Sequence, residues 1–340
     1  GKAEKAVYFI CVAFILCAPW SLVGMQICAL CGFALSMALW SRNGTPKLNS
    51  LDISVLIYLA AVLFSLFSAP DIPFDWLRST SFWPIVAYWP LREAADRLQK
   101  SSKLFTALSG VLTIVSIYAI LQAFFGLDIM RPSNPISYPN PGRAAPYAVF
   151  GFFDRHHTFA ASMGMLTLFC ISGLSKNTEK NRLPALVLPA LFSTAAVFLA
   201  QARAVFIALP FSVGVTAILK IKKQVVYVIV VLMLIVPAAL IFLNDTASDR
   251  LLHPINSDNA RIKIMQIAAV VQSERPLSGW GVGHFYLVAD NYFDAMQPDV
   301  YVRSGTHNDF MQMLFDGGIP LAFSFMLLIA AIFNHAIKLA

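Results

Sequence analysis

The sequence predicts an all-α fold, a polytopic transmembrane helical bundle of about ten spans with a long outward loop that contains short helices. Hydrophobic residues make up 58% of the 340 residues and charged residues 13%, about half the charged share of a soluble globular protein. The mean hydropathy is +0.68. Apolar runs near twenty residues, the length that crosses about 30 Å of hydrocarbon, recur along the chain. A β-barrel would show short alternating segments instead and is excluded.

Each span is an apolar run bounded by polar or basic residues. The fourth is short and aromatic, and its Trp83-Pro84 and Trp89-Pro90 pairs indicate kinks or interface anchors. The first is expected to be a span or signal anchor and not a removable signal peptide. With no internal repeat, residues 1–340 are expected to form a single integral membrane domain. The predicted spans are 6–19, 21–40, 51–69, 79–91, 104–125, 157–174, 183–200, 203–219, 224–243 and 318–336.

Basic residues predict the orientation, because Lys and Arg in short loops stay in the cytoplasm. An inside N-terminus places fifteen of the 25 basic residues in the cytoplasm, eleven of them Lys. Nine of the ten outward basic residues are Arg, whose planar fork of donors matches phosphate or carboxylate. The outward face is therefore interpreted as selected for oxyanion contact, although small numbers could also give this bias. Nucleic acid is not expected as a partner, because topology accounts for the positive excess.

Two outward loops are long, at residues 126–156 and 244–306. The first holds five prolines, which predict an irregular loop. The second is predicted to carry most of the chemistry. Five of the six histidines also fall on the outward side: His156, His157, His253, His284 and His307.

A helix is predicted in the second loop, capped by Ser257 or Asp258 and ended by Pro276. Arg261 would lie in its first turn, where the helix dipole disfavours a cation unless an anion shares the site. A bound phosphate would explain this placement, and a solvated arginine is the alternative.

The next motif is Pro276-Leu-Ser-Gly279-Trp280-Gly281-Val-Gly283-His284. Alternating glycines let the backbone approach a ligand or another helix closely. No strand-to-helix unit surrounds them, so this is not a dinucleotide-binding motif.

Thr306-His307-Asn308-Asp309 precedes a short helix and the breaker Asp316-Gly317-Gly318-Ile319-Pro320. An imidazole at this outward helix start could take a proton from a hydroxyl, with Asn308 or Asp309 orienting it. A neutral capping role for the segment is the alternative.

Two further basic positions are candidates. Arg203, in Gln201-Ala202-Arg203, falls in a turn between two spans, where an ionisable group is expensive and marks a functional site. Structural pairing with an acidic residue is the alternative. Arg155, His156 and His157 open the sixth span, and adjacent histidines on a helix point about 100° apart, which argues against a metal site. The five cysteines lie in apolar runs and are interpreted as buried hydrophobes, including the Cys28–Cys31 pair.

Gln201-Ala-Arg203, Asn259-Ala-Arg261, the glycine motif and His307-Asn308 with Asp316-Gly-Gly-Ile together resemble the bacterial O-antigen ligase and O-antigen polymerase superfamily. The resemblance covers about residues 145–330. Ala202 stands where the family has Ser. The family has about a dozen spans, so two more are expected beyond Ala340.

The resemblance implies a glycosyltransferase in the bacterial inner membrane with its active site facing the periplasm. It would move a glycan from undecaprenyl diphosphate to a lipid A core sugar, among membrane lipids and without cofactor or metal. Arg203, Arg261 and His307 match the family's essential residues. Inversion is expected, because His307 would activate an acceptor attacking opposite the diphosphate. A monomer is expected, with substrate bound by Arg155, His156, His157, Lys263, Arg275, Gly281, Gly283 and Asn308.

Two alternatives stay open. The same chemistry with another acceptor would make a polysaccharide polymerase or a protein O-oligosaccharyltransferase. A transporter of an anionic lipid or solute could use the arginines as a binding site, although transporters commonly show related halves and ionisable groups at the midplane.

Overall fold

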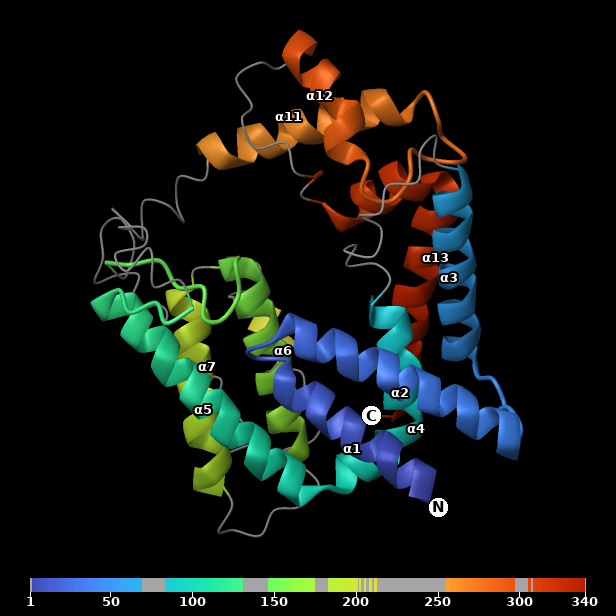
Figure 1. Ribbon diagram of the computed structural model, residues 1–340. Coiled ribbons are helices and arrows are strands. Elements are labelled where there is room, and N and C mark those ends of the chain that lie inside the picture. The colour runs from blue at the N-terminus through green and yellow to red at the C-terminus, as the bar shows by residue number, and fades with distance from the viewer. Residues whose placement is uncertain are drawn as a thin grey trace. The chain divides into compact units, whose positions relative to one another are not determined.

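The computed structural model describes residues 2–68, 83–130, 146–174, 183–200, 255–296, 305–306 and 308–339, with isolated positions between 202 and 212. Over these residues the chain is helical and has no strand. It forms two compact units, whose helices are labelled in Figure 1. Unit 1 comprises Gly1–Leu39 and Trp89–His253, and unit 2 comprises Trp40–Tyr88 and Pro254–Ala340.

The prediction of an all-helical chain with helices able to span a membrane is confirmed over the described residues, while the number of spans stays a prediction. Four helices in the described part are long and apolar enough to cross a membrane: Leu22–Asn43, Ser50–Ser68, Ser102–Phe125 and Asp309–Lys338. A shorter apolar helix covers Pro189–Leu199. The predicted spans 203–219 and 224–243 fall almost entirely outside the described residues.

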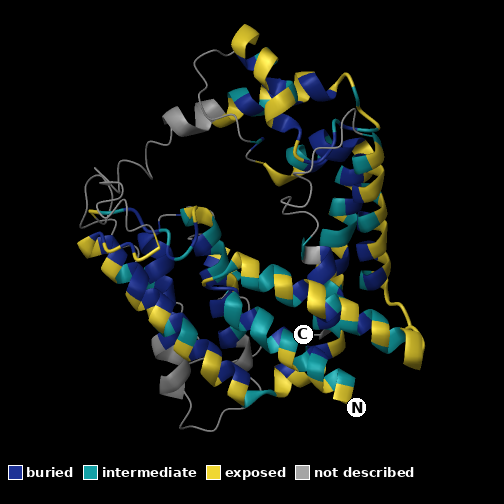
Figure 2. Cartoon of the chain, in the orientation of Figure 1, coloured by how far each residue is buried: buried dark blue, intermediate teal, exposed yellow. Residues whose placement is uncertain are grey.

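Unit 1 contains α1 (Lys2–Cys17), α2 (Leu22–Asn43, to Leu39), α5 (Ser102–Phe125), α6 (His156–Leu174) and α7 (Leu183–Leu199). Helix α7 packs against α5 and α6, and α1 packs against α5. Their facing sides form one core, seen as the buried residues of these helices in Figure 2. This core includes Cys11 and Cys170, whereas Cys31 is exposed on α2, so the prediction of buried cysteines is wrong there.

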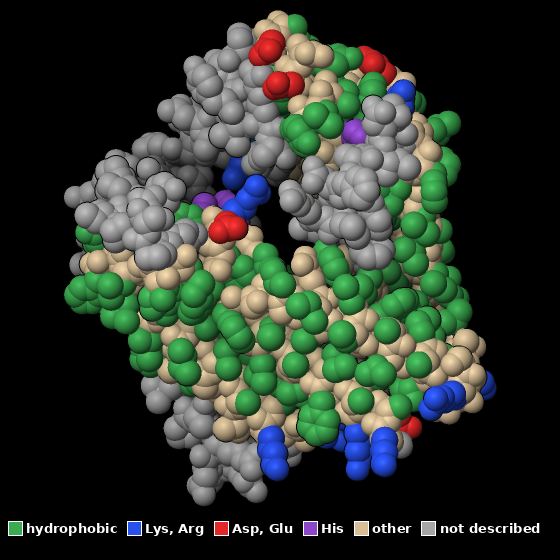
Figure 3. Space-filling model, in the orientation of Figure 1, with side chains coloured by type: hydrophobic (Ala, Val, Ile, Leu, Met, Phe, Trp, Pro, Cys, Tyr) green, Lys and Arg blue, Asp and Glu red, His purple; other side chains and the backbone are tan. Residues whose placement is uncertain are grey.

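The outward sides of these helices are also apolar. On α5, Leu108, Leu112 and Ala119 are fully buried, yet Ile114 and Phe124 are 66% and 50% exposed. Figure 3 shows hydrophobic side chains covering the visible sides of the unit 1 helices, with Lys and Arg gathered where α1 and α5 begin. Apolar surface exposed to water costs about 25 cal/mol per Å², so such a surface suits a lipid environment.

Helix α4 (Trp83–Lys100) corrects the prediction of a short fourth span. It begins with the predicted Trp-Pro pairs but continues past Leu91 into a charged second half. Pro90 lies inside the helix, in contact range of Gly32 on α2. The span predicted from hydropathy ends at residue 91, where charged residues begin. The helix continues because it needs only continued backbone hydrogen bonding.

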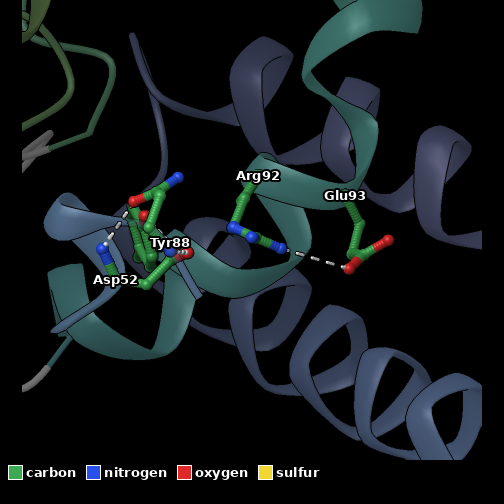
Figure 4. A network of polar contacts seen from close by, with 5 residues as sticks. Asp52, Tyr88, Arg92 and Glu93 are labelled. Carbon is green, nitrogen blue, oxygen red and sulfur yellow. Dashed lines mark hydrogen bonds and ion pairs between the residues drawn. The ribbon is translucent and has the colours of Figure 1, made fainter. Parts of the chain in front are cut away.

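Helix α3 (Ser50–Ser68) begins with a reciprocal cap in unit 2. The Asp52 backbone N–H donates to Asn49 Oδ1 at 2.9 Å, and the Asn49 N–H donates to Asp52 Oδ2 at 2.7 Å. Tyr88 OH donates to Asp52 Oδ1 at 2.6 Å, which ties the start of α3 to α4 (Figure 4). Figure 4 also shows the Arg92–Glu93 ion pair of α4, at 3.7 Å.

Unit 2 also contains α11 (Ile255–Gln272), α12 (Phe285–Met296) and α13 (Asp309–Leu339). Helix α13 packs along α3 (Figure 1). Helices α11 and α12 pack on each other and on the first turns of α13 around buried apolar side chains, namely Ile264, Ile267, Ala268, Val271, Phe285, Ala289, Phe293 and Phe315. The described part of the second predicted loop is thus largely helical, and α11 covers 18 residues.

Candidate active site

The glycine motif forms a turn that docks on α13. Gly279, Gly281 and Gly283 all have left-handed φ values, of 67°, 97° and 85°. The Trp280 N–H donates to the Phe315 carbonyl at 2.9 Å, and the Gly281 N–H donates to the Asp316 carbonyl at 2.8 Å. Of the two possibilities that the glycines allowed, ligand or helix, the structure therefore shows close approach to a helix. Substrate binding by Gly281 and Gly283 stays a prediction.

Glycine is required on both sides of this contact. A Cβ at Gly279 would lie 2.6 Å from the Asp316 carbonyl oxygen, and one at Gly318 would lie 2.5 Å from the Leu277 carbonyl oxygen. Gly317 and Gly318 depart from helical geometry, so α13 is kinked where the sequence predicts a breaker. Across the kink the Ile319 N–H donates to the Pro276 carbonyl at 2.9 Å. The kink and the glycine turn therefore fix each other.

Asp316 is the buried polar centre of this contact, with 3% of its surface exposed. Its carboxylate accepts hydrogen bonds from Gln312 Nε2 at 2.7 Å and from the Gly283 backbone N–H. Its carbonyl also accepts from Ser65 Oγ of α3, at 2.5 Å. A buried carboxyl needs such partners, because an unpaired one would carry a large desolvation penalty.

The start of α13 is held by side chains that flank His307. Asn308 Oδ1 accepts from the Met311 N–H at 3.1 Å, so Asn308 is the N-cap of the helix. Thr306, which is fully buried, places its hydroxyl 2.8 Å from the Asn308 carbonyl, and its N–H donates to Gln312 Oε1 at 3.1 Å. His307 itself lies outside the described residues. The capping role considered for this segment thus belongs to Asn308.

Arg261 lies one helical turn from a residue that contacts this cap. Asn308 Nδ2 is 3.8 Å from Met265 Sδ on α11. Residues four apart on a helix share a face, with Cβ atoms about 5–6 Å apart, so Arg261 is on the same face as Met265. Unit 2 therefore brings together two of the predicted motifs, those of Arg261 and His307.

The Arg261 side chain is exposed, and within the described part of the chain it has no hydrogen bond or ion pair. Helix α11 begins at least two residues before the predicted cap, so Arg261 lies in its second turn and not its first. The predicted pairing of Arg261 with the first-turn N–H groups is wrong in that detail. The exposed Arg261 side chain could still bind an external anion without help from the first-turn N–H groups.

Lys263 and Arg275 do not share the face of Arg261. Two residues along a helix turn it by about 200°, so Lys263 points to another side of α11, where it is half-buried. Arg275 follows the helix, and its guanidinium carbon lies 4.5 Å from the centre of the Trp280 ring. Cation–π contact of this kind is worth about 0.5–1 kcal/mol at an exposed site, and it braces the glycine turn.

Arg155, His156 and His157 lie at the start of α6, in unit 1. The two imidazole rings are 3.8 Å apart between centroids, closer than a simple 100° separation on a helix suggests. His156 also meets Phe150 edge to face at 6.1 Å. Three basic groups at the positive end of a helix are mutually unfavourable and favour an anion nearby. No group of three or more His, Cys, Asp or Glu side chains that could hold a metal occurs among the described residues.

Arg203 lies outside the described residues. Its neighbour Ala202 is 2% exposed and belongs to the unit 1 core with Leu199 and Ala200. A Cβ at Gly164 of α6 would lie 2.9 Å from Val205, so Val205 packs closely against α6.

Four polar residues have structural roles in the site that the sequence motifs did not predict: Thr306, Gln312, Asp316 and His284. Asn308, Gln312 and Asp316 recur every fourth position among apolar residues, a stripe that predicts one polar helix face. His284 is 3% exposed, and neither imidazole nitrogen has a hydrogen-bond partner among the described residues. Only its position after the third glycine could have indicated it.

Comparison with known proteins agrees with the motifs. Residues 188–326 match the family model described as O-antigen ligase. The matched region runs from α7 to α13 and includes Arg203, Arg261, the glycine turn and His307. None of the curated proteins compared with the chain matches it. The resemblance predicted from the sequence is therefore confirmed: over these residues the chain matches the O-antigen ligase family model, which supports its likeness to the O-antigen ligase and polymerase superfamily.

Proposed function

We propose that the protein is an O-antigen ligase that transfers a glycan from undecaprenyl diphosphate to a lipid A core hydroxyl on the periplasmic side of the inner membrane. The family match supports a membrane glycosyltransferase of this superfamily. The observation that carries the proposal is the Asn308–Met265 contact, because it sets the residue after His307 one helical turn from Arg261.

The reaction needs two kinds of group. The bond between the anomeric carbon and the diphosphate oxygen breaks, and negative charge develops on the leaving diphosphate. Guanidinium groups of Arg261 and Arg203 would stabilise that charge, a role whose loss typically costs about 10²–10³ in rate. The acceptor oxygen forms the new bond to the anomeric carbon, and its proton passes to His307, a general-base contribution of about 10²–10⁴. The geometry of in-line attack makes the reaction inverting.

Basic residues of both units suit binding of an anionic lipid headgroup. In unit 2, Arg261 is exposed, and its guanidinium offers five donors that match a diphosphate. In unit 1, Arg155, His156 and His157 lie at a helix N-terminus, a place that favours anions. We assign these residues, with Lys263, Arg275 and Asn308, to binding of the headgroup and its glycan.

Reconstitution of the purified protein tests the function. The protein is incubated with a diphosphate-linked glycan and lipid A core, with divalent metals chelated, and the joined product is measured. Wild-type protein is expected to form it, while Arg261→Ala, Arg203→Ala and His307→Ala lose at least about 10² in rate. Arg42→Ala, at the exposed end of α2, is the matched control and should retain full activity.

Varying the acceptor distinguishes a ligase from a polysaccharide polymerase or a protein O-oligosaccharyltransferase. Parallel reactions offer lipid A core, a second diphosphate-linked glycan, or an acceptor peptide. Product on lipid A core alone supports a ligase, whereas product on only one of the other two acceptors would overturn that assignment. Uptake of the lipid-linked glycan into liposomes without any transfer would contradict the proposal that the protein is an enzyme and would favour a transporter.

A further inference from the structure

We propose that Gln312 is a positioning residue that holds the main chain around His307 by linking Thr306 to the buried carboxylate of Asp316. The inference rests on the proposed function of His307 as the general base. The evidence is a continuous set of hydrogen bonds from the glycine turn to the start of α13.

The partners of Gln312 dictate the orientation of its amide. The Thr306 backbone N–H can only donate, so the Oε1 atom of Gln312 must face it, at 3.1 Å, with the Thr306 hydroxyl at 3.3 Å. The Nε2 group then faces Asp316 and donates to its carboxyl group at 2.7 Å. Both ends of the amide are used, and a flipped amide would set donor against donor.

These contacts anchor the residues on both sides of His307. Thr306 is tied through its N–H to Gln312 and through its hydroxyl to the backbone of Asn308. Asn308 is tied by its capping bond to Met311 and by its carbonyl, which accepts from the Gln312 N–H at 2.8 Å. His307 is thus the single residue between two anchored ones, and Gln312 contacts both anchors.

Asp316 connects this anchor to the rest of the site. The same carboxylate accepts from the Gly283 N–H, and the Asp316 carbonyl accepts from the Gly281 N–H. Because Asp316 is buried, its hydrogen bonds are shielded from water and are stronger than exposed ones. Gln312 therefore links Thr306 and Asn308, which flank the base, to the docking of the glycine turn on α13.

Exchanging the two side chains of the link tests the proposal. Gln312→Glu sets a second carboxylate against Asp316 and breaks the link. When Asp316→Asn is added to Gln312→Glu, the introduced amide donates to the introduced carboxylate, while its carbonyl oxygen accepts from Gly283. We expect Gln312→Glu to lower kcat about 10²-fold, the loss that a displacement near 1 Å can produce, with KM for the donor unchanged. The double variant should recover most of kcat.

Hydrogen exchange separates failure of the link from failure of the proposed function, because it needs no substrate. The peptide covering Thr306 to Met311 should exchange faster in Gln312→Glu and return to the wild-type rate in the double variant. If the exchange follows this pattern but all proteins transfer glycan at equal rates, the positioning role is overturned. Unchanged exchange in Gln312→Glu would overturn the link. Absence of transfer by wild-type protein would overturn the proposed function and leave the exchange result standing.

Discussion

At the scale of single residues, the site contains polar side chains with hydrogen-bond partners, Asp316 and Gln312, and a buried polar side chain, His284, without one among the described residues. Asp316 and Gln312 are buried or half-buried and use every partner that their geometry offers. His284 is buried without any partner for its imidazole among the described residues. A buried polar group without a hydrogen bond typically costs about 1–3 kcal/mol. The same few turns thus contain both stabilising and destabilising polar groups.

Replacing His284 should consequently stabilise the fold. His284→Leu fills a similar volume without polar atoms, and we expect it to raise the free energy of unfolding by about 1–3 kcal/mol. Thermal unfolding in detergent measures the change. Asn291→Leu on the exposed side of α12 is the control and should leave the midpoint unchanged. A lower midpoint for His284→Leu would mean that the imidazole makes a stabilising interaction.

Arg261 is predicted to act as a bidentate fork and not only as a positive charge. Arg261→Lys keeps the charge but loses the planar pair of donors. We therefore expect its transfer rate to fall between those of wild type and Arg261→Ala in the reconstituted assay. Equal rates for Arg261→Lys and wild type would contradict phosphate recognition by the fork.

At the scale of elements, the glycine turn and the kink of α13 depend on each other. Gly279 and Gly44 both have left-handed φ, of 67° and 83°, so alanine at either position carries the backbone penalty of about 1–2 kcal/mol. Only Gly279 would also place a Cβ against the Asp316 backbone, whereas Gly44 has nothing within 4 Å. The difference between the two positions isolates the docking contact.

Gly279→Ala should destabilise the protein by clearly more than Gly44→Ala. The added clash is with backbone atoms, which cannot move aside as a flexible side chain can. Denaturation followed by loss of helical circular dichroism compares the two variants. Equal losses would show that the turn and α13 are not in close contact.

The cap of α3 gives a second prediction at this scale. Tyr88→Phe removes the hydrogen bond to the buried Asp52 carboxylate, and a hydrogen bond to a charged group is worth about 1.5–3 kcal/mol. We expect a loss of stability of that size, seen as a lower unfolding midpoint. Tyr286→Phe, on the exposed start of α12, removes the same hydroxyl and should have little effect.

Hydropathy predicts the helices that are apolar throughout. It misses a helix that passes from apolar into charged residues. The spans expected at 104–125 and 157–174 correspond to Ser102–Phe125 and His156–Leu174. Helix α4 continues into charged residues that a span prediction cannot include. The helix start expected after His307 and the span expected from 318 correspond to the two parts of α13, which meet at the non-helical Gly317 and Gly318.

The candidate site was predictable in its charged motifs but not in its supporting contacts. Arg261 and the His307 motif were identified from residue type and outward position, and the structure brings α11 and Asn308 together. Gln312 and Asp316 sit in a mostly apolar run, where their role depends on the glycine turn more than thirty residues earlier in the chain. Their spacing of four predicts one polar helix face, but their pairing with the glycine turn is fixed by tertiary packing and leaves no local signal.

At the scale of the whole molecule, the predicted topology requires basic residues to gather on the cytoplasmic side of the membrane. In unit 1, Arg97 of α4 pairs with Glu4 of α1 at 2.6 Å, and Tyr8 OH donates to Ser101 Oγ at 2.7 Å. These contacts place the start of α1 and the corner between α4 and α5 at one end of the unit. Lys2, Lys5, Lys100 and Lys103 lie along the same segments, in agreement with the predicted cytoplasmic side.

Cysteine labelling tests this topology. In a protein without its native cysteines, Ser273→Cys after α11 should react with a membrane-impermeant maleimide on intact spheroplasts. Lys103→Cys should react only after the membrane is permeabilised. Both positions are exposed in the structure, so access differs only through the membrane. Labelling of Lys103→Cys from outside, or of Ser273→Cys only from inside, would invert the orientation.

The most direct measurement asks whether the face of α11 that carries Arg261 lies against the residue that follows His307. In the cysteine-free protein, Met265→Cys with Asn308→Cys is treated in membranes with a short thiol-to-thiol cross-linker. Gln266→Cys with Asn308→Cys is the control, because Gln266 lies about 100° further around the helix. Efficient cross-linking of the Met265 pair, and much less of the Gln266 pair, is the predicted result. Equal yields, or none for the Met265 pair, would show that Arg261 and His307 do not share one site.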